Sequence, residues 1–136
     1  MKPIFRTLVT VIAAACILSR GAVAQARSAA GSPVGVWRGT SLCLVRESPC
    51  HDETVVYRIS AAGAADSFSI DARKIVNGQE EEMGILGCRF ADANAELRCI
   101  IRNAVWSFSV RRDSLVGELR LRDGTKFRDV RTVRSP

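Results

Sequence analysis

Hydrophobic and polar residues alternate in short segments along most of the chain after residue 33, and turn-forming residues separate these segments. This period of two is typical of β-strands that have one face in a core and the other in solvent. Residues 61–65 include helix formers, but they are few and centred on Gly63, which favours a loop. The pattern predicts eight strands, at roughly 34–45, 54–60, 66–74, 82–91, 96–102, 105–111, 114–122 and 126–133.

The strand register in the C-terminal half follows from placing apolar residues opposite one another. A slip of one residue would move a whole apolar face into solvent. A two-residue turn at 103–104 would pair Cys99 with Phe108, and the next turn, at 112–113, would pair Phe108 with Gly117. Both hairpins place core positions against core positions, so each supports the other.

The positions of the cysteines are consistent with the same strand register. A turn centred on residues 93–94 places Cys88 directly opposite Cys99. Opposed Cα atoms at a non-hydrogen-bonded position lie about 4.5 Å apart, which is a distance that a disulfide accepts. Cys43 and Cys50 are then left to pair across a short loop. We therefore predict two disulfides, each contributing roughly 2.5–3 kcal/mol in the chain-entropy description.

Upstream, two patterns conflict. Asn-Gly at residues 77–78 predicts a tight hairpin that would pair Ile70 with Ile85. That pairing puts the odd-numbered residues of the following strand inward, whereas the cysteine register puts the even-numbered residues inward. Either a β-bulge near Gly84 or Gly87 reconciles the two patterns, or one of the registers is wrong.

The first 24 residues have the composition of a signal peptide. Lys2 and Arg6 precede about 13 mostly apolar residues, and an A-x-A cleavage site ends at Ala24. The apolar run is shorter than the ~20 residues of a membrane-spanning helix, so we expect no membrane association after cleavage. Four further cysteines indicate an oxidising compartment, and we expect a secreted or periplasmic protein. The predicted organisation is a signal peptide at 1–24, a flexible tail at 25–33 and one β-barrel domain at 34–136.

The net charge of the chain and the motifs that it lacks argue against several classes of function. Removing residues 1–24 leaves 112 residues with 17 Lys and Arg against 14 Asp and Glu, so the net charge of about +3 does not favour a nucleic-acid partner. The chain has no G-x-S-x-G, H-E-x-x-H or phosphate-binding loop. The single histidine, His51, fits a solvated loop better than a metal site, and cysteine spacings of 7, 38 and 11 do not resemble a zinc site. We expect no catalytic residue, cofactor or metal, although two carboxylates meeting across a barrel would suit glycosidase chemistry.

Gly35-Val36-Trp37 resembles the G-x-W signature of the calycins, the superfamily of lipocalins and avidins. The resemblance implies an eight-stranded antiparallel up-and-down barrel, in which Trp37 closes one end and an arginine from the last strand packs over it. Arg128 and Arg131 are the candidates for that arginine. The chain is shorter than a typical lipocalin, and it lacks the tryptophan-rich pattern of avidins, so biotin binding is not implied. Bacterial periplasmic protease inhibitors with a small calycin-like barrel are nearer in size.

A barrel of eight strands is either filled by its own side chains or holds one small ligand. Trp106, Phe108 and Phe90 are expected to face the interior, as core residues or as ligand contacts. The sequence thus predicts a monomeric binding module for a small apolar or amphipathic ligand. The alternatives are a protease-inhibitor-like or other protein-interaction barrel that docks another secreted protein, and a structural protein without a pocket.

Overall fold

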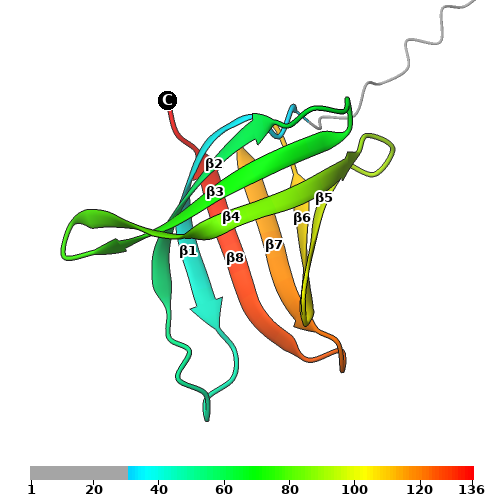
Figure 1. Cartoon of the computed structure of the whole chain (residues 1–136). Helices are drawn as coiled ribbons and strands as arrows, with labels where there is room; N and C mark the ends of the chain where they lie inside the picture. The colour runs from blue at the N-terminus through cyan, green and yellow to red at the C-terminus, as the bar shows by residue number, and fades with distance from the viewer. Residues whose placement is uncertain (1–30) are drawn as a thin grey trace, which may run out of the picture.

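The computed structural model describes residues 31–136 as a closed barrel, in which each strand pairs antiparallel with the next and β1 pairs with β8 (Figure 1). The strands are β1 Gly35–Cys43, β2 Glu53–Ala61, β3 Ser67–Val76, β4 Gln79–Ala91, β5 Glu96–Ile101, β6 Ala104–Val110, β7 Ser114–Leu121 and β8 Lys126–Arg134. The predicted all-β fold and strand order are confirmed. The predicted signal peptide and residues 25–30 of the tail lie outside the described residues. Among the described residues, no helix is long and apolar enough to cross a membrane.

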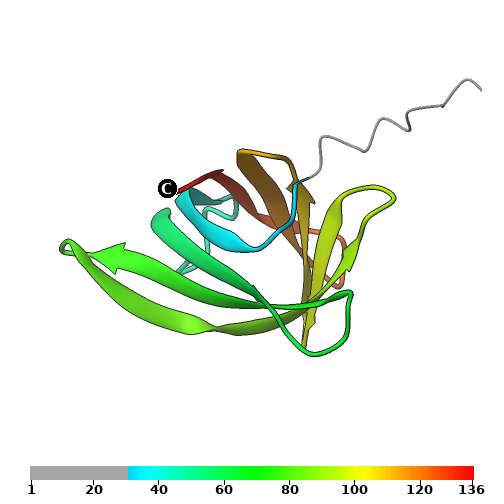
Figure 2. The same cartoon turned by 90° about the horizontal axis from the view of Figure 1, so that it is seen from above.

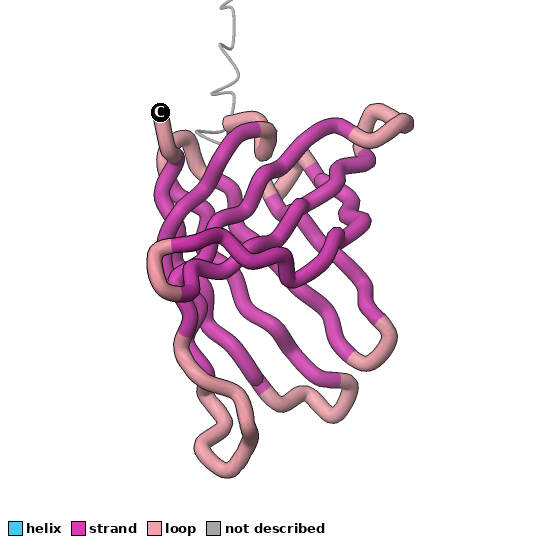
Figure 3. The backbone as a smooth tube through the Cα atoms, turned by 60° about the vertical axis from the view of Figure 1, so that its left-hand side comes forward, coloured by secondary structure: helices cyan, strands magenta, loops and turns pink. Residues whose placement is uncertain are grey.

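One face of every strand points into the barrel, and large apolar side chains on these faces fill one end of the interior. We call this the closed end; it carries residues 31–34 and the C-terminus (Figure 2). The opposite end, which we call the open end, carries the β1–β2 loop (44–52) and the β7–β8 loop (122–125) (Figure 3). Large buried side chains pack the closed end: Trp37, Ile59, Ile70, Leu97, Val110 and Leu115.

An arginine covers Trp37 at the closed end. The guanidinium carbon of Arg134 lies 4.1 Å from the centroid of the Trp37 ring. Arg134 also donates hydrogen bonds to the carbonyl oxygens of Ser32, at 2.7 Å, and Val34, at 2.6 Å. The Trp37 indole donates to the carbonyl of Pro33 at 2.9 Å, and Pro33 is fully buried. The last residues of the predicted tail are therefore part of the closed end.

Neither Arg128 nor Arg131, the two arginines predicted to cover Trp37, does so. The side chain of Arg131 is 74% exposed and lies beside Asp129 on the outer face. Arg128 faces the interior, as Arg134 does, but it lies six positions earlier in β8, roughly 20 Å away at the open end. The inward positions of β8 are even-numbered, and only the last of them reaches the tryptophan.

The predicted registers hold for one hairpin and need a correction for the other. Phe108 pairs with Gly117 across β6 and β7, as predicted. The β5–β6 turn occupies residues 102–103, one residue earlier than predicted, and Cys99 pairs with Trp106 rather than with Phe108. This displaces the register by two residues. Because strands have a period of two, the predicted inward face is still correct.

A β-bulge in the β3–β4 hairpin resolves the conflict between the two patterns. Asn77 and Gly78 form the turn, with positive φ angles of 50° and 77°. Further along the hairpin Ala72 pairs with Gly84, which leaves Met83 as the extra residue of β4. Gly84 has a φ of 140°, a conformation that is almost restricted to glycine. The bulge predicted near Gly84 is confirmed.

Both predicted disulfides are present. The Cα atoms are 5.8 Å apart in Cys43–Cys50 and 4.1 Å apart in Cys88–Cys99. Cys88–Cys99 lies where β4 and β5 begin to diverge, and beyond it the β3–β4 hairpin projects from the barrel (Figures 1 and 2). Two disulfides indicate that the domain folds in an oxidising compartment.

Candidate ligand-binding cavity

The open end of the barrel contains a cavity of about 310 Å³. Small residues at three positions of its wall, Ser41, Ala72 and Gly84, explain the space. Large side chains take the corresponding positions at the closed end, where the interior is packed. The remaining lining forms an apolar wall and a polar corner.

Aromatic rings form the apolar wall. Trp106 stacks on Phe108, with ring centroids 5.5 Å apart and planes 6° from parallel. The ring of Tyr57 meets Phe108 edge-on at 5.9 Å. Leu86 and Ile101 complete this side of the cavity. Ring faces and aliphatic groups of this kind suit an apolar ligand group.

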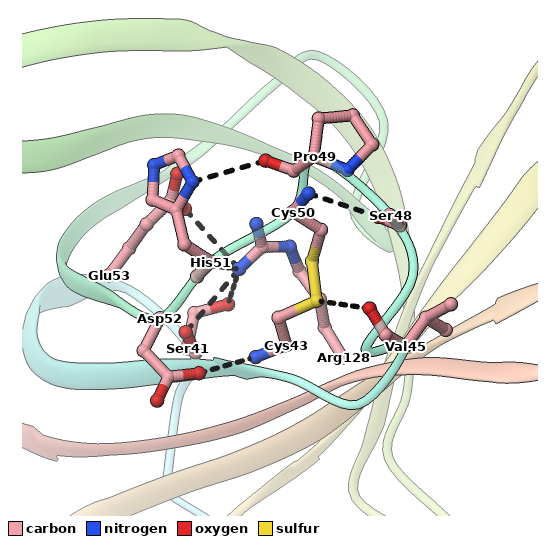
Figure 4. The surroundings of a disulfide bond; sticks show 10 residues. All are labelled: Ser41, Cys43, Val45, Ser48, Pro49, Cys50, His51, Asp52, Glu53 and Arg128. Atoms are coloured by element: carbon pink, nitrogen blue, oxygen red, sulfur yellow. Dashed lines mark hydrogen bonds and ion pairs between the residues drawn. A yellow bond between two sulfur atoms is a disulfide. The ribbon is translucent and has the colours of Figure 1, made fainter.

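Arg128 organises the polar corner (Figure 4). Its Nη1 donates to Oγ of Ser41 at 3.1 Å and to the carbonyl oxygens of Ser41 and His51, each at 3.3 Å. The same nitrogen lies 3.4 Å from Oε2 of Glu53, and the two side chains are only 13% and 15% exposed. Within residues 31–136, Nε and Nη2 of Arg128 form no hydrogen bond. Every buried side-chain nitrogen in this range has a hydrogen-bond partner, so these two donors must be accessible to solvent. The corner therefore combines a neutralised ion pair with donors that remain free.

The hydroxyl of Tyr57 stays protonated at neutral pH. Burial raises the pKa of Tyr57 above its ordinary range, and the positive charge of Arg128 offsets only part of this effect. Tyr57 is 3% exposed and lines the cavity. It thus offers a neutral donor and acceptor beside the charged pair.

The β1–β2 loop (44–52) is fixed beside the mouth of the cavity. The Cys43–Cys50 disulfide closes its base, and the backbone amide of Cys43 donates to the carboxylate of Asp52 at 2.8 Å. Arg128 binds the same loop through the carbonyl of His51 (Figure 4). Within residues 31–136, no three His, Cys, Asp or Glu side chains come together as a metal-binding group.

The aromatic residues singled out from the sequence divide between the two ends. Trp106 and Phe108 line the cavity, as expected of ligand-facing residues. Phe90 does not line it: β4 carries this residue toward the closed end, where it packs edge-on against Phe68 with centroids 5.9 Å apart. Trp37 also lies at the closed end, so its role is in the core.

Three polar residues of the cavity, besides the apolar Ala72 and Met83, were missed by reasoning from the sequence. Ser41 and Tyr57 lie on the inward face of β1 and β2, and strand alternation from Trp37 and Val55 would have found them. Glu53 carries a weaker signal, because the predicted strand began at residue 54. Its charge also favoured assignment to the loop.

A wider depression of about 560 Å³ lies on the outer face of β5 to β8. Its lining includes Ser107 and Ser109 of β6. Glu118 at its edge already pairs with Lys126, at 3.4 Å, and with Arg120. This depression is more open to solvent than the cavity, and the charges at its edge are paired with one another, so the cavity at the open end is the better candidate for a ligand site.

No family model, no curated protein and no solved structure matches this chain. The fold and the disulfides define its class as a small, closed, antiparallel β-barrel of eight strands with two internal cross-links. Its function is therefore inferred from the geometry of its own residues.

Proposed function

We propose that this protein is a secreted or periplasmic binding module of calycin-like type, which holds a small apolar or amphipathic ligand at the open end of its barrel. The observation that carries the proposal is the unfilled interior beside Trp106 and Phe108. Ligand pockets are mostly apolar, contain a few polar groups and measure about 300–1,000 Å³. A cavity of about 310 Å³ is at the lower end of this range, so the part of the ligand that enters is small.

The two sides of the cavity suggest the chemistry of the ligand. The stacked rings of Trp106 and Phe108 would contact an apolar body. The free Nε and Nη2 donors of Arg128 would bind an acceptor group such as a carboxylate or sulfonate. Because Glu53 already neutralises Arg128, an anionic head would compete with this carboxylate, and we expect moderate affinity.

Three features support the calycin-like assignment. The barrel has eight strands in up-and-down order, and Trp37 of the G-x-W sequence lies in its first strand. An arginine of the last strand, Arg134, packs over that tryptophan. The two disulfides fit the secreted or periplasmic location proposed from the leader.

The test is titration of the folded protein with 8-anilino-1-naphthalenesulfonate and with its uncharged relative N-phenyl-1-naphthylamine. We expect saturable one-to-one binding of both probes. Trp106→Ala should weaken both at least tenfold, because an aromatic contact is worth about 1 kcal/mol or more beyond the buried area. Arg128→Met should weaken only the sulfonate. Val116→Ala, at a position that is 43% exposed on the outer face, is the matched control.

Two results would contradict the proposal. One is the absence of saturable binding to protein that still unfolds cooperatively in urea. The other is an equal loss of affinity in the Trp106→Ala and Val116→Ala variants, which would mean that the probes bind the outside of the barrel.

A second candidate, docking of another secreted protein, is favoured by the disulfide-closed loop. This loop is held rigid at both ends, and Leu44 at its base is 45% exposed. A preformed loop loses little conformational entropy on binding. Under this reading, Leu44→Asp should abolish capture of a protease or other partner by the pure protein and leave probe binding unchanged.

A further inference from the structure

The wall of the barrel is incomplete between β4 and β5. These strands share three residue pairs, from Arg89–Arg98 to Ala91–Glu96, whereas β3 and β4 share ten. Beyond the Cys88–Cys99 disulfide, no strand of the described chain pairs with this edge of β4. We call the opening between β4 residues 83–87 and β5 residues 99–101 the seam.

Local structure explains why the seam exists. The β-bulge at Met83 and Gly84 bends β4, and the φ of 140° at Gly84 directs the hairpin away from β5. At the opposite end of the seam, the Cys88–Cys99 disulfide holds the two strands at a Cα–Cα distance of 4.1 Å. The seam therefore widens from the disulfide toward the open end (Figure 1).

The seam lies in the wall of the ligand cavity. On one side the cavity is lined by Met83 and Leu86 of β4, and on the other by Ile101 of β5. Side chains rather than a hydrogen-bonded ladder thus separate the cavity from solvent here. Such a barrier opens by rotation of a few side chains, on a time scale of nanoseconds for exposed residues.

Apolar surface continues through the seam to the outside. Ile85 is 68% exposed and Ile100 is 75% exposed, one on each flanking strand. Met83, 40% exposed, and Ile101, 37% exposed, lie on the same two strands and line the cavity. Exposed aliphatic residues grouped around an opening differ from the isolated ones that any surface carries.

We propose that the seam is a lateral portal, and that the ligand is a single-chain amphiphile whose hydrocarbon tail leaves the barrel between β4 and β5. The inference rests on the proposed function and specifies its ligand class. The polar head binds at Arg128, the first part of the chain packs on Trp106, and the rest lies along Ile85 and Ile100. A cavity of about 310 Å³ then accepts tails longer than it can enclose.

The first test places the tail by nuclear magnetic resonance. A sixteen-carbon carboxylate with a nitroxide at its far end is bound to the protein, and amide line-broadening is measured. We expect selective broadening at Gly87 and Ile100, beside the seam. Selective broadening at Ser48 and Gly124 instead would show that the tail leaves through the open end, and would overturn the portal.

The second test compares chain lengths in a surface variant. Each methylene in apolar contact strengthens binding about fourfold. Ile85→Arg combined with Ile100→Arg should therefore weaken the sixteen-carbon carboxylate at least tenfold and leave the eight-carbon carboxylate unchanged. Val116→Arg combined with Val133→Arg is the matched control, at positions 43% and 60% exposed.

The outcomes separate the two proposals. If the native protein binds both carboxylates and the isoleucine variant binds them equally well, the portal is wrong and the binding function stands. If the native protein binds neither carboxylate nor either naphthalene probe, the proposed function fails, and the portal fails with it.

Discussion

Replacing Arg134 by alanine should lower the free energy of unfolding by about 3 kcal/mol. The guanidinium group donates to three backbone carbonyls, those of Ser32, Val34 and Arg112, at 2.6 to 2.9 Å. It also lies over the ring of Trp37. One side chain thus joins β8 to the segment before β1 and to the β6–β7 turn.

The magnitude follows from these contacts. A hydrogen bond contributes about 1 kcal/mol net, and a cation over an aromatic ring contributes about 0.5–2 kcal/mol. The gross sum is near 4 kcal/mol, and partial solvent exposure of the guanidinium reduces it to about 3 kcal/mol. For a small domain with a total stability of about 5–15 kcal/mol, this loss is large. It corresponds to a fall in Tm of roughly 12 °C or more.

The assay is urea unfolding followed by tryptophan fluorescence, with both disulfides intact. Arg134→Lys keeps the positive charge near Trp37 but loses the planar fork, so we expect about half of the loss. Arg131→Ala removes an arginine that is 74% exposed, and its cost should stay below about 0.5 kcal/mol. Equal unfolding midpoints for the Arg134 and Arg131 variants would refute the reasoning.

Three further substitutions test the fold. Gly84→Ala should lower the free energy of unfolding by about 1–3 kcal/mol, because a φ of 140° strains any residue other than glycine. Gly87→Ala, where the added methyl group has equally open space, should be close to neutral in the same urea assay. Gly39→Ala would place its Cβ against the backbone of β8 and should cost at least as much as an overpacked core, about 1–3 kcal/mol. Lys126, 2.9 Å from Asp129, lowers the pKa of that carboxyl below the ordinary 3.8. A lowered folded-state pKa gives stability that is present above pH 3.8 and lost as the pH falls through the folded value. Lys126→Met should therefore destabilise the protein more at pH 7 than at pH 2.

Strand order and disulfide pairing could be predicted because both depend on alternation, which is local in the sequence. Cys88 and Cys99 lie opposite each other in the register set by the β4–β5 turn, and alternation puts both on the inward face of their strands. An error of one residue in the β5–β6 turn moved the partner of Cys99 by two positions but left every inward side chain inward. The sequence therefore determines the inward face of each strand better than it determines which residues pair between strands.

The cavity and the arginine at Trp37 could not be predicted in the same way. Whether Arg128, Arg131 or Arg134 reaches the tryptophan depends on the length of the last turn and on an irregularity in the β7–β8 register near Leu119. The space at the open end depends on small residues in strands that are not neighbours in the sequence, as Ser41 and Ala72 show. Such volumes are properties of the assembled barrel.

The two ends of the barrel separate stability from binding. The buried side chains of the closed end, with Arg134 over Trp37, carry most of the packing that would be lost on unfolding. At the open end the lining is looser, because Trp106 and Leu86 are only partly buried and no side chain of residues 31–136 fills the cavity that they line. Substitutions in the cavity wall should therefore change ligand affinity more than they change the unfolding midpoint. A Trp106→Ala variant that lost binding and stability in the same proportion would show that the cavity is a defect of packing rather than a site.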